Sequence, residues 1–189
     1  MQKNNLQEIA EKIKNELAPK EKEYNLIFSL QDKINKTDVH IFRYEPVTSQ
    51  NLKLHAPHVT VILDNSGNLK GFARLSEDMV NINSISESKG KEIALSFFKK
   101  YAPDLVNSDF QWTDDYSEKI IDKNGRTAKA NGLWVKFREK KTGHYLWVMV
   151  APDGSIMEFD RDIIWSFFRG GRVNELWLRD EWLGKKIKK

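Results

Sequence analysis

The first 75 residues combine one helical pattern of apolar residues with four segments that have the composition of strands. Leu6, Ile9, Ala10, Ile13 and Leu17 recur at helical spacing, which predicts a helix over residues 6–17 that ends at Ala18-Pro19. Aromatic and β-branched residues then predict strands at 24–30, 38–44, 58–63 and 69–75. The turn Asp64-Asn65-Ser66-Gly67 joins the last two strands as a hairpin.

The same order of patterns begins again after residue 85. Glu92-Ile93-Ala94 and Ala102-Pro103 each lie 84 positions after their counterparts Glu8-Ile9-Ala10 and Ala18-Pro19. Ser86 or Ser88 is placed to cap this second helix, whose buried stripe is Ile93, Phe97 and Tyr101. Strands are predicted at 110–114, 133–138, 145–150 and 156–160. The order α-β-β-β-β therefore occurs twice.

This repeat predicts an α+β protein made of two tandem units, each with one helix packed on an antiparallel sheet of about four strands. The first unit spans residues 1–76 and the second spans 87–163, with a short polar linker at 77–86. Residues 164–189 have no counterpart in the first unit and form a C-terminal extension.

The extension begins with an apolar and aromatic run, 163–168, which Gly170-Gly171 interrupts. Asn174 is placed to cap a short helix that continues through Leu183. One face of this helix is mostly apolar and is expected to pack against the domain; it carries Val173, Leu176, Trp177, Asp180 and Leu183. Residues 184–189 are expected to fray into solvent.

Composition makes the two halves unequal. Residues 1–86 carry 11 basic and 11 acidic side chains, whereas residues 87–189 carry 20 and 16, so the whole net charge of +4 lies in the second half. A basic tail of this density is typical of a solvated surface, and the alternative is a site for nucleic acid or anionic lipid. With no cysteine, the chain has no disulfide, thiolate metal site or cysteine nucleophile.

Motifs for catalysis or cofactor binding are weak. The chain contains no G-x-G-x-x-G, no phosphate-binding loop and no G-x-S-x-G. The histidine pair His55 and His58 is separated by Pro57, so it does not form the helical pair of a metalloprotease. Asp160 and Asp162 share a face if the strand continues past residue 160, but Arg161 and the basic tail offer them a simpler ion-pairing role. We therefore expect no cofactor, no metal and no catalytic residue.

The central strands of the second unit contain the most informative surface. Alternation along 133–138 places Leu133, Val135 and Phe137 on one face and Trp134, Lys136 and Arg138 on the other, where water is expected. The register that decides the face of Tyr145, Trp147 and Met149 is open. The aromatic and cationic face fits an acidic polypeptide or single-stranded nucleic acid. The alternative, which we favour, is a cross-strand packing ladder or a contact with the first unit.

The second unit also resembles a known family. Its serine-capped helix, 85–94 running to Tyr101-Ala102-Pro103, and its Asp153-Gly154 hairpin are similar to PepSY-like repeats, particularly those of YcdB/YcdC-type proteins. Residues 85–160 fit best, residues 4–75 fit by element order, and 163–189 lie outside the resemblance. The resemblance implies a cystatin-like fold, a bacterial protein and a propeptide or peptidase-inhibitory role at the cell envelope, with no catalytic constellation.

These observations favour a non-enzymatic module that binds a protein or peptide. The first alternative is a nucleic-acid-binding protein, and the second is a small hydrolase whose site assembles from distant residues. The candidate binding residues are Trp134, Lys136, Arg138, Trp147, Arg169 and Arg172. No run approaches the roughly 18 apolar residues of a membrane span. The compartment depends on Met1: cytoplasm if it is native, cell envelope or secretion if a signal peptide was removed.

Overall fold

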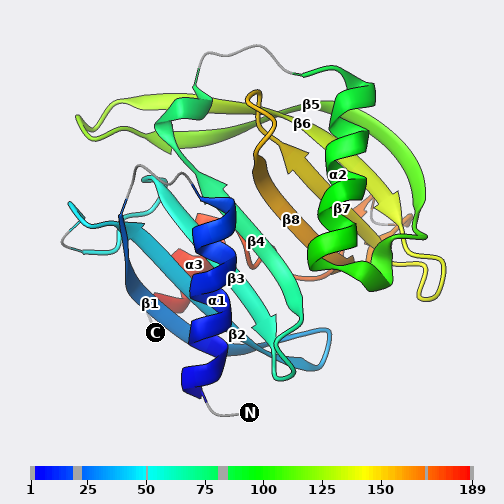
Figure 1. Cartoon of the computed structure of the whole chain (residues 1–189), viewed down its shortest axis with the longest axis horizontal. Coiled ribbons are helices and arrows are strands. Elements are labelled where there is room, and N and C mark those ends of the chain that lie inside the picture. Colours follow the sequence, from blue (N-terminus) through cyan, green and yellow to red (C-terminus); the bar gives the residue numbers. More distant parts are fainter. Residues whose placement is uncertain (1–2, 19–22, 50, 81–84, 169, 188–189) are drawn as a thin grey trace.

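The computed structural model describes residues 3–18, 23–49, 51–80, 85–168 and 170–187. The predicted order of elements is confirmed, because one helix and four strands occur twice in succession (Figure 1). The first set is α1 (Lys3–Leu17), β1 (Tyr24–Ile34), β2 (Thr37–Pro46), β3 (His58–Asp64) and β4 (Leu69–Leu75). The second set is α2 (Glu87–Tyr101), β5 (Asp109–Ile121), β6 (Thr127–Arg138), β7 (Tyr145–Val150) and β8 (Ile156–Ile163). β9 (Trp165–Ser166), β10 (Gly171–Arg172) and α3 (Asp180–Ile187) follow.

The expectation of two separate four-stranded sheets is wrong. All eight strands of the two sets form one antiparallel sheet in the order β1-β2-β3-β4-β8-β7-β6-β5. The last strands of the two sets pair at its centre, with Gly71 opposite Asp160, Phe72 opposite Phe159 and Ala73 opposite Glu158. This pairing satisfies backbone groups that two separate sheets would leave unpaired at their edges. The protein is therefore α+β with one continuous sheet.

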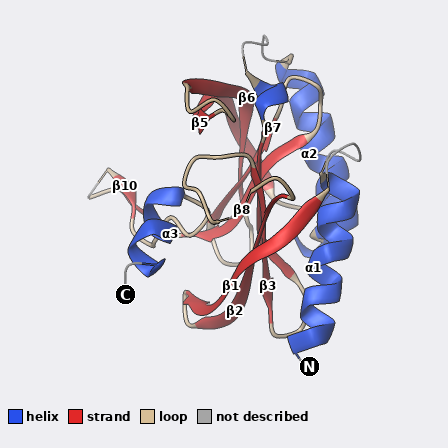
Figure 2. Cartoon of the chain, turned by 90° about the vertical axis from the view of Figure 1, so that its left-hand side faces the viewer, coloured by secondary structure: helices blue, strands red, loops and turns tan. Residues whose placement is uncertain are grey.

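Both long helices cover the same face of this sheet (Figures 1 and 2). α1 buries Leu6, Ala10 and Ile13, while α2 buries Ala94, Phe97 and Phe98. These side chains belong to one apolar cluster that includes strands from both sets, so the two halves share a core. Ser86 is the cap of α2, because its hydroxyl accepts a hydrogen bond from the Lys89 backbone N–H at 3.4 Å.

The C-terminal segment lies on the opposite face of the sheet (Figure 2). The predicted helix from Asn174 to Leu183 is wrong at both ends, because α3 begins at Asp180 and continues to Ile187. The Asn174 side chain instead accepts from the Ile164 N–H at 3.3 Å and donates to the Asp162 carbonyl at 3.0 Å. The expectation that 184–189 frays is wrong for 184–187, which are helical, and 188–189 lie outside the described residues.

The predicted lengths of three strands are also wrong. β1 extends four residues past Leu30 to a turn at Asn35 and Lys36, both with positive φ, and β5 and β6 extend far beyond 110–114 and 133–138. The part of the predicted linker before residue 81 is also structured. It contains a 3₁₀ helix, Glu77–Met79, and a bridge from Val80 to Ala130 of β6, while residues 81–84 lie outside the described chain.

Candidate functional site

The face of the sheet that the long helices leave uncovered carries a ladder of tryptophans across three strands. Trp134 of β6 packs edge-to-face against Trp112 of β5 and Trp147 of β7, with ring centroids 5.0 and 5.1 Å apart. Lys136 lies opposite both Trp112 and Trp147. The register therefore places Tyr145, Trp147 and Met149 on the Trp134 face, which the sequence left open. The cross-strand ladder is present.

Lys136 lies in a box of three aromatic rings. Its Nζ is 5.0 Å from the ring centroid of Trp112, 4.3 Å from that of Tyr145 and 4.6 Å from that of Trp165. Lys136 is only 7% exposed, whereas the alternation predicted a solvated side chain. The rings cover its stem, and each offers the negative face of its π-system to the ammonium. Burial lowers the pKa of this ammonium.

The other predicted site residues divide between the surface and the interior. Arg138 is exposed, and its guanidinium lies 5.8 Å from the Tyr145 ring. Arg172 is bound inward: its guanidinium is 2.5 Å from the Asp160 carboxylate and lies over the rings of Trp147 and Trp177. The buried Trp147 indole donates a hydrogen bond to Glu158 at 3.3 Å. Arg169 lies outside the described residues, so its assignment as a candidate binding residue stays a prediction.

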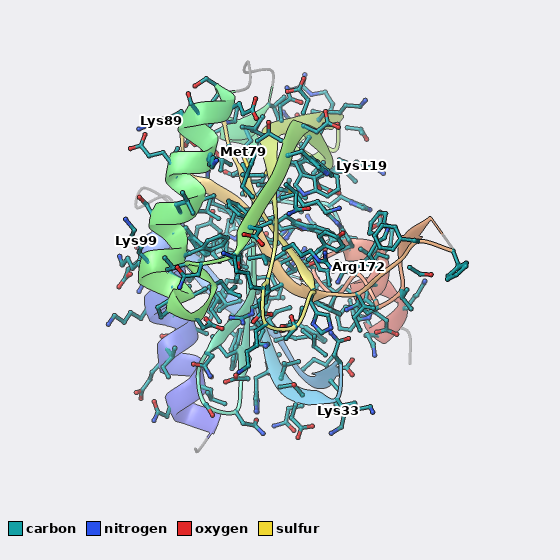
Figure 3. All side chains as sticks on the ribbon, turned by 90° about the vertical axis from the view of Figure 1, so that its right-hand side faces the viewer. Lys33, Met79, Lys89, Lys99, Lys119 and Arg172 are labelled. Atoms are coloured by element: carbon teal, nitrogen blue, oxygen red, sulfur yellow. The ribbon has the colours of Figure 1, made fainter. Side chains whose placement is uncertain are left out.

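A short hairpin projects from the sheet beside the Lys136 box (Figure 2). β9 pairs with β10, with Trp165 opposite Arg172, and Gly170 supplies the positive φ of 62° that the turn requires. Phe167 is 79% exposed and Phe168 is fully exposed at the tip. Arg172 lies at the base of the hairpin (Figure 3). Sequence reasoning read this run as an apolar segment with a glycine break, although Gly170-Gly171 after an aromatic run is also a hairpin signal.

A second polar cluster, which sequence reasoning missed, lies where the C-terminal segment meets the sheet. Arg43 of β2 binds Asp180 at the start of α3, with Nη1 and Oδ1 2.6 Å apart, and the other Asp180 oxygen accepts from the His55 backbone N–H. Arg179 binds the carboxylates of Glu118 and Glu158. Asp180, Arg179 and the two glutamates line a cavity of about 20 Å³, which has room for about one water molecule. Their distance along the sequence hid the cluster.

Burial shifts the pKa values of two groups that line this cavity. Burial raises the pKa of Glu158 to about 7, with Asp160 and Glu118 adding to the rise and the Arg179 charge opposing it. Burial lowers the pKa of His58 to about 4, and the Arg43 guanidinium adds to this effect. His58 is therefore neutral near pH 7. Its Nδ1 is 2.9 Å from the Ala56 carbonyl oxygen, a donor position for the neutral ring.

The cluster places the His58 ring near the Asp180 carboxylate, an arrangement relevant to the hydrolase alternative, but the cavity beside them has no room for a substrate. Both Asp180 oxygens accept hydrogen bonds from the protein, and the cavity is the size of one water molecule. The arrangement holds the C-terminal segment to the sheet. Within the part of the chain that the structure describes, no three His, Cys, Asp or Glu side chains gather as a metal site.

No described helix has the length and apolar character needed to cross a membrane. Comparisons with protein-family models, curated proteins and solved structures found no match to this chain. The resemblance to PepSY-like repeats therefore stays an expectation from the sequence, and the geometry of the two faces carries the functional argument.

Proposed function

We propose that this chain is a non-enzymatic module that binds a protein or peptide, and that the β9–β10 hairpin is the centre of its binding surface. The observation that carries the proposal is the exposure of Phe167 and Phe168 at the tip of this hairpin. Removing a phenylalanine side chain from water is worth roughly 1.5–3 kcal/mol, and aromatic side chains dominate the energy of protein interfaces. A partner that covers both rings gains affinity at this point.

The fold proposal is that the two halves are cystatin-like units of the PepSY type, joined through β4 and β8. It is supported by the repeated order of one helix and four strands and by the two helices on one face. A peptidase-inhibitory or regulatory role is the form of protein binding that this resemblance implies. A projecting hairpin suits it, because such a loop enters a cleft on a partner.

The nucleic-acid alternative has less support from the same face. Bases stack on open ring faces, whereas the tryptophans of the ladder pack edge-to-face with each other at interplanar angles of 70° and 81°. The faces of Trp112 and Trp165 are turned to Lys136. The exposed rings of Phe167 and Phe168 lie on the turn between β9 and β10. The arrangement favours a protein partner.

The proposal is tested by selecting peptides from a random display library on the immobilised full-length protein. We expect recovered peptides to bind in fluorescence-anisotropy titrations and to lose at least about 10-fold in affinity against the double variant Phe167→Ser/Phe168→Ser. The melting temperature of this variant should stay close to wild type, because both rings are exposed.

Val47→Ser is the matched control, since Val47 is also an exposed apolar residue but follows β2. Its affinity for the peptides should equal that of the wild type. The proposal fails if the library yields no binder, or if the recovered peptides bind the double variant as tightly as they bind the wild type.

A further inference from the structure

Lys136 differs from the buried arginines of the same molecule in having no acidic partner among the described residues. Arg43, Arg74 and Arg161 are buried, and each has a carboxylate oxygen within 4.0 Å. Lys136 is buried to a similar extent, yet it makes no hydrogen bond or ion pair with any residue that the structure describes. Within the described chain its charge is offset by aromatic rings, which compensate an ammonium less well than a carboxylate does.

The box around Lys136 adjoins exposed surface on two sides. Trp112, which forms one wall, belongs to the edge strand β5 and is 38% exposed. Trp165, which forms another wall, is the first residue of the hairpin that carries Phe167 and Phe168. A chain that covers the hairpin tip can therefore continue onto the box. Arg138, whose guanidinium lies 5.8 Å from the centroid of the Tyr145 ring, adds a second positive charge.

Taking these points together, we infer that Lys136 and its three rings are the docking point for a carboxylate of the partner peptide. This inference rests on the proposed function, and it names the partner's chemistry: an apolar segment that meets Phe167 and Phe168, with an aspartate, a glutamate or a free C-terminus that reaches the box. The carboxylate supplies the acidic partner that Lys136 lacks within the described chain, while the rings exclude water around the new ion pair.

The burial of Lys136 explains why a carboxylate fits better than a neutral group. Its ammonium has already lost most of its water in the folded protein, so pairing adds attraction at a small further cost of desolvation. The pKa of Lys136, which burial lowers in the free protein, should rise when a carboxylate binds. The same peptide with asparagine or glutamine in place of the acid should therefore bind more weakly.

The first experiment uses the peptides that the library selection recovers. We expect them to be enriched in an acidic residue or to bind through their C-terminus, and to lose about 10-fold in affinity against Lys136→Met but less than about 3-fold against Lys136→Arg. Lys140→Met is the control, because Lys140 is an exposed lysine that pairs with Asp109. Peptides without acidic enrichment, or equal affinity for wild type and Lys136→Met, would overturn the inference.

The second experiment probes the box with a defined carboxylate. In ¹H–¹⁵N NMR spectra of the full chain, phenylacetate should shift the indole N–H signals of Trp112 and Trp165, whereas the neutral isostere phenylacetamide should not. The shifts should disappear in Lys136→Met and persist in Phe167→Ser/Phe168→Ser, which separates this inference from the proposed function. Shifts that are equal for both probes would overturn it.

An oligothymidylate of eight nucleotides is the final arm of the test. If the box binds a carboxylate, the oligonucleotide should leave the indole signals of Trp112 and Trp165 unshifted at concentrations where phenylacetate shifts them. If the oligonucleotide instead moves them at lower concentration, and added salt reverses the effect steeply, the box binds phosphate of nucleic acid and the carboxylate assignment is overturned.

Discussion

Buried ion pairs between single residues attach the C-terminal segment to the sheet. The side chains of Arg43 and Asp180 are 1% and 5% exposed, and their oxygen and nitrogen atoms lie 2.6 Å apart. A buried ion pair of this kind adds little net stability compared with an apolar pair of the same size. Removing one partner of the pair is costly, because the charge of the other partner then stays buried without compensation.

Asp180→Ala should therefore destabilise the fold strongly. We expect a loss of about 3 kcal/mol in the free energy of unfolding, at the low end of the 3–5 kcal/mol typical of a broken buried pair. The value is at the low end because Glu45 still lies 3.3 Å from the Arg43 guanidinium. Urea denaturation followed by circular dichroism measures the change.

Asp38→Ala is the control for this prediction, because Asp38 pairs with Lys33 at the surface, where both side chains are more than half exposed. Its loss should stay below about 1 kcal/mol. Similar losses for Asp180→Ala and Asp38→Ala would mean that the Arg43–Asp180 pair does not anchor the segment.

Glu158 should make the stability of the fold depend on pH. Its folded pKa of about 7 exceeds its ordinary value of 4.5, so the folded state holds a proton that the unfolded chain releases. This contribution is fully present below about pH 4.5 and is lost as the pH rises through about 7. Relative to wild type, Glu158→Gln should gain up to about 3 kcal/mol across this window, as measured by urea denaturation at several pH values.

His58 acts in the opposite direction over an overlapping range. Its folded pKa of about 4 lies below its ordinary value of 6.5, so its contribution is present above about pH 6.5 and is lost as the pH falls through about 4. Comparing Glu158→Gln with wild type at each pH removes this shared effect. A difference between the two proteins that is constant from about pH 4.5 to 8 would contradict the role assigned to Glu158.

The sequence predicted the faces of single residues better than their surroundings. Alternation placed Leu133 and Trp134 on opposite faces correctly, because the period of a strand is fixed by its geometry. It predicted water around Lys136, however, and the structure shows rings from β5, β7 and β9 there. A local pattern contains no information about which distant segment covers a face.

Strands with a strong apolar pattern were predicted with nearly correct bounds. The length of a strand that is extended mainly by backbone pairing was underestimated. β3 and β4 have almost continuous buried residues and were predicted within a residue of their ends. β5 alternates mainly between exposed and half-buried side chains, and only part of its length showed a pattern. Backbone pairing with β6 extends the strand, and the pattern of side chains in the sequence gives no sign of this pairing.

In the C-terminal extension, the local sequence likewise failed to predict where a helix begins. Asn174 has the side chain of a good cap, which favoured a helix from that position. In the structure, its side chain instead joins the Ile164 N–H to the Asn35 side chain of the turn after β1. A residue suited to a cap is also suited to a bridge between loops. Only the fold decides between the two.

For the molecule as a whole, the sequence revealed the repeat of elements but not the pairing of β4 with β8 that joins the two halves. The order α-β-β-β-β can be read twice from the sequence, but β4 and β8 show no local signal that they pair with each other. Once they pair, side chains from both halves form one apolar cluster beneath α1 and α2. A shared core of this kind predicts that the two halves unfold together.

The tryptophans make this cooperativity measurable, because all six lie in the second half, at positions 112, 134, 147, 165, 177 and 182. Val61 is fully buried on β3 in the first half, and Val61→Ala should cost about 2 kcal/mol. In one cooperative unit, this change lowers the midpoint of the tryptophan-fluorescence transition in urea as much as the circular-dichroism midpoint.

Val47→Ala, an exposed control, should move neither midpoint. If the fluorescence midpoint stays fixed while circular dichroism shows an earlier phase, the halves are independent domains and β4–β8 is only a contact between them.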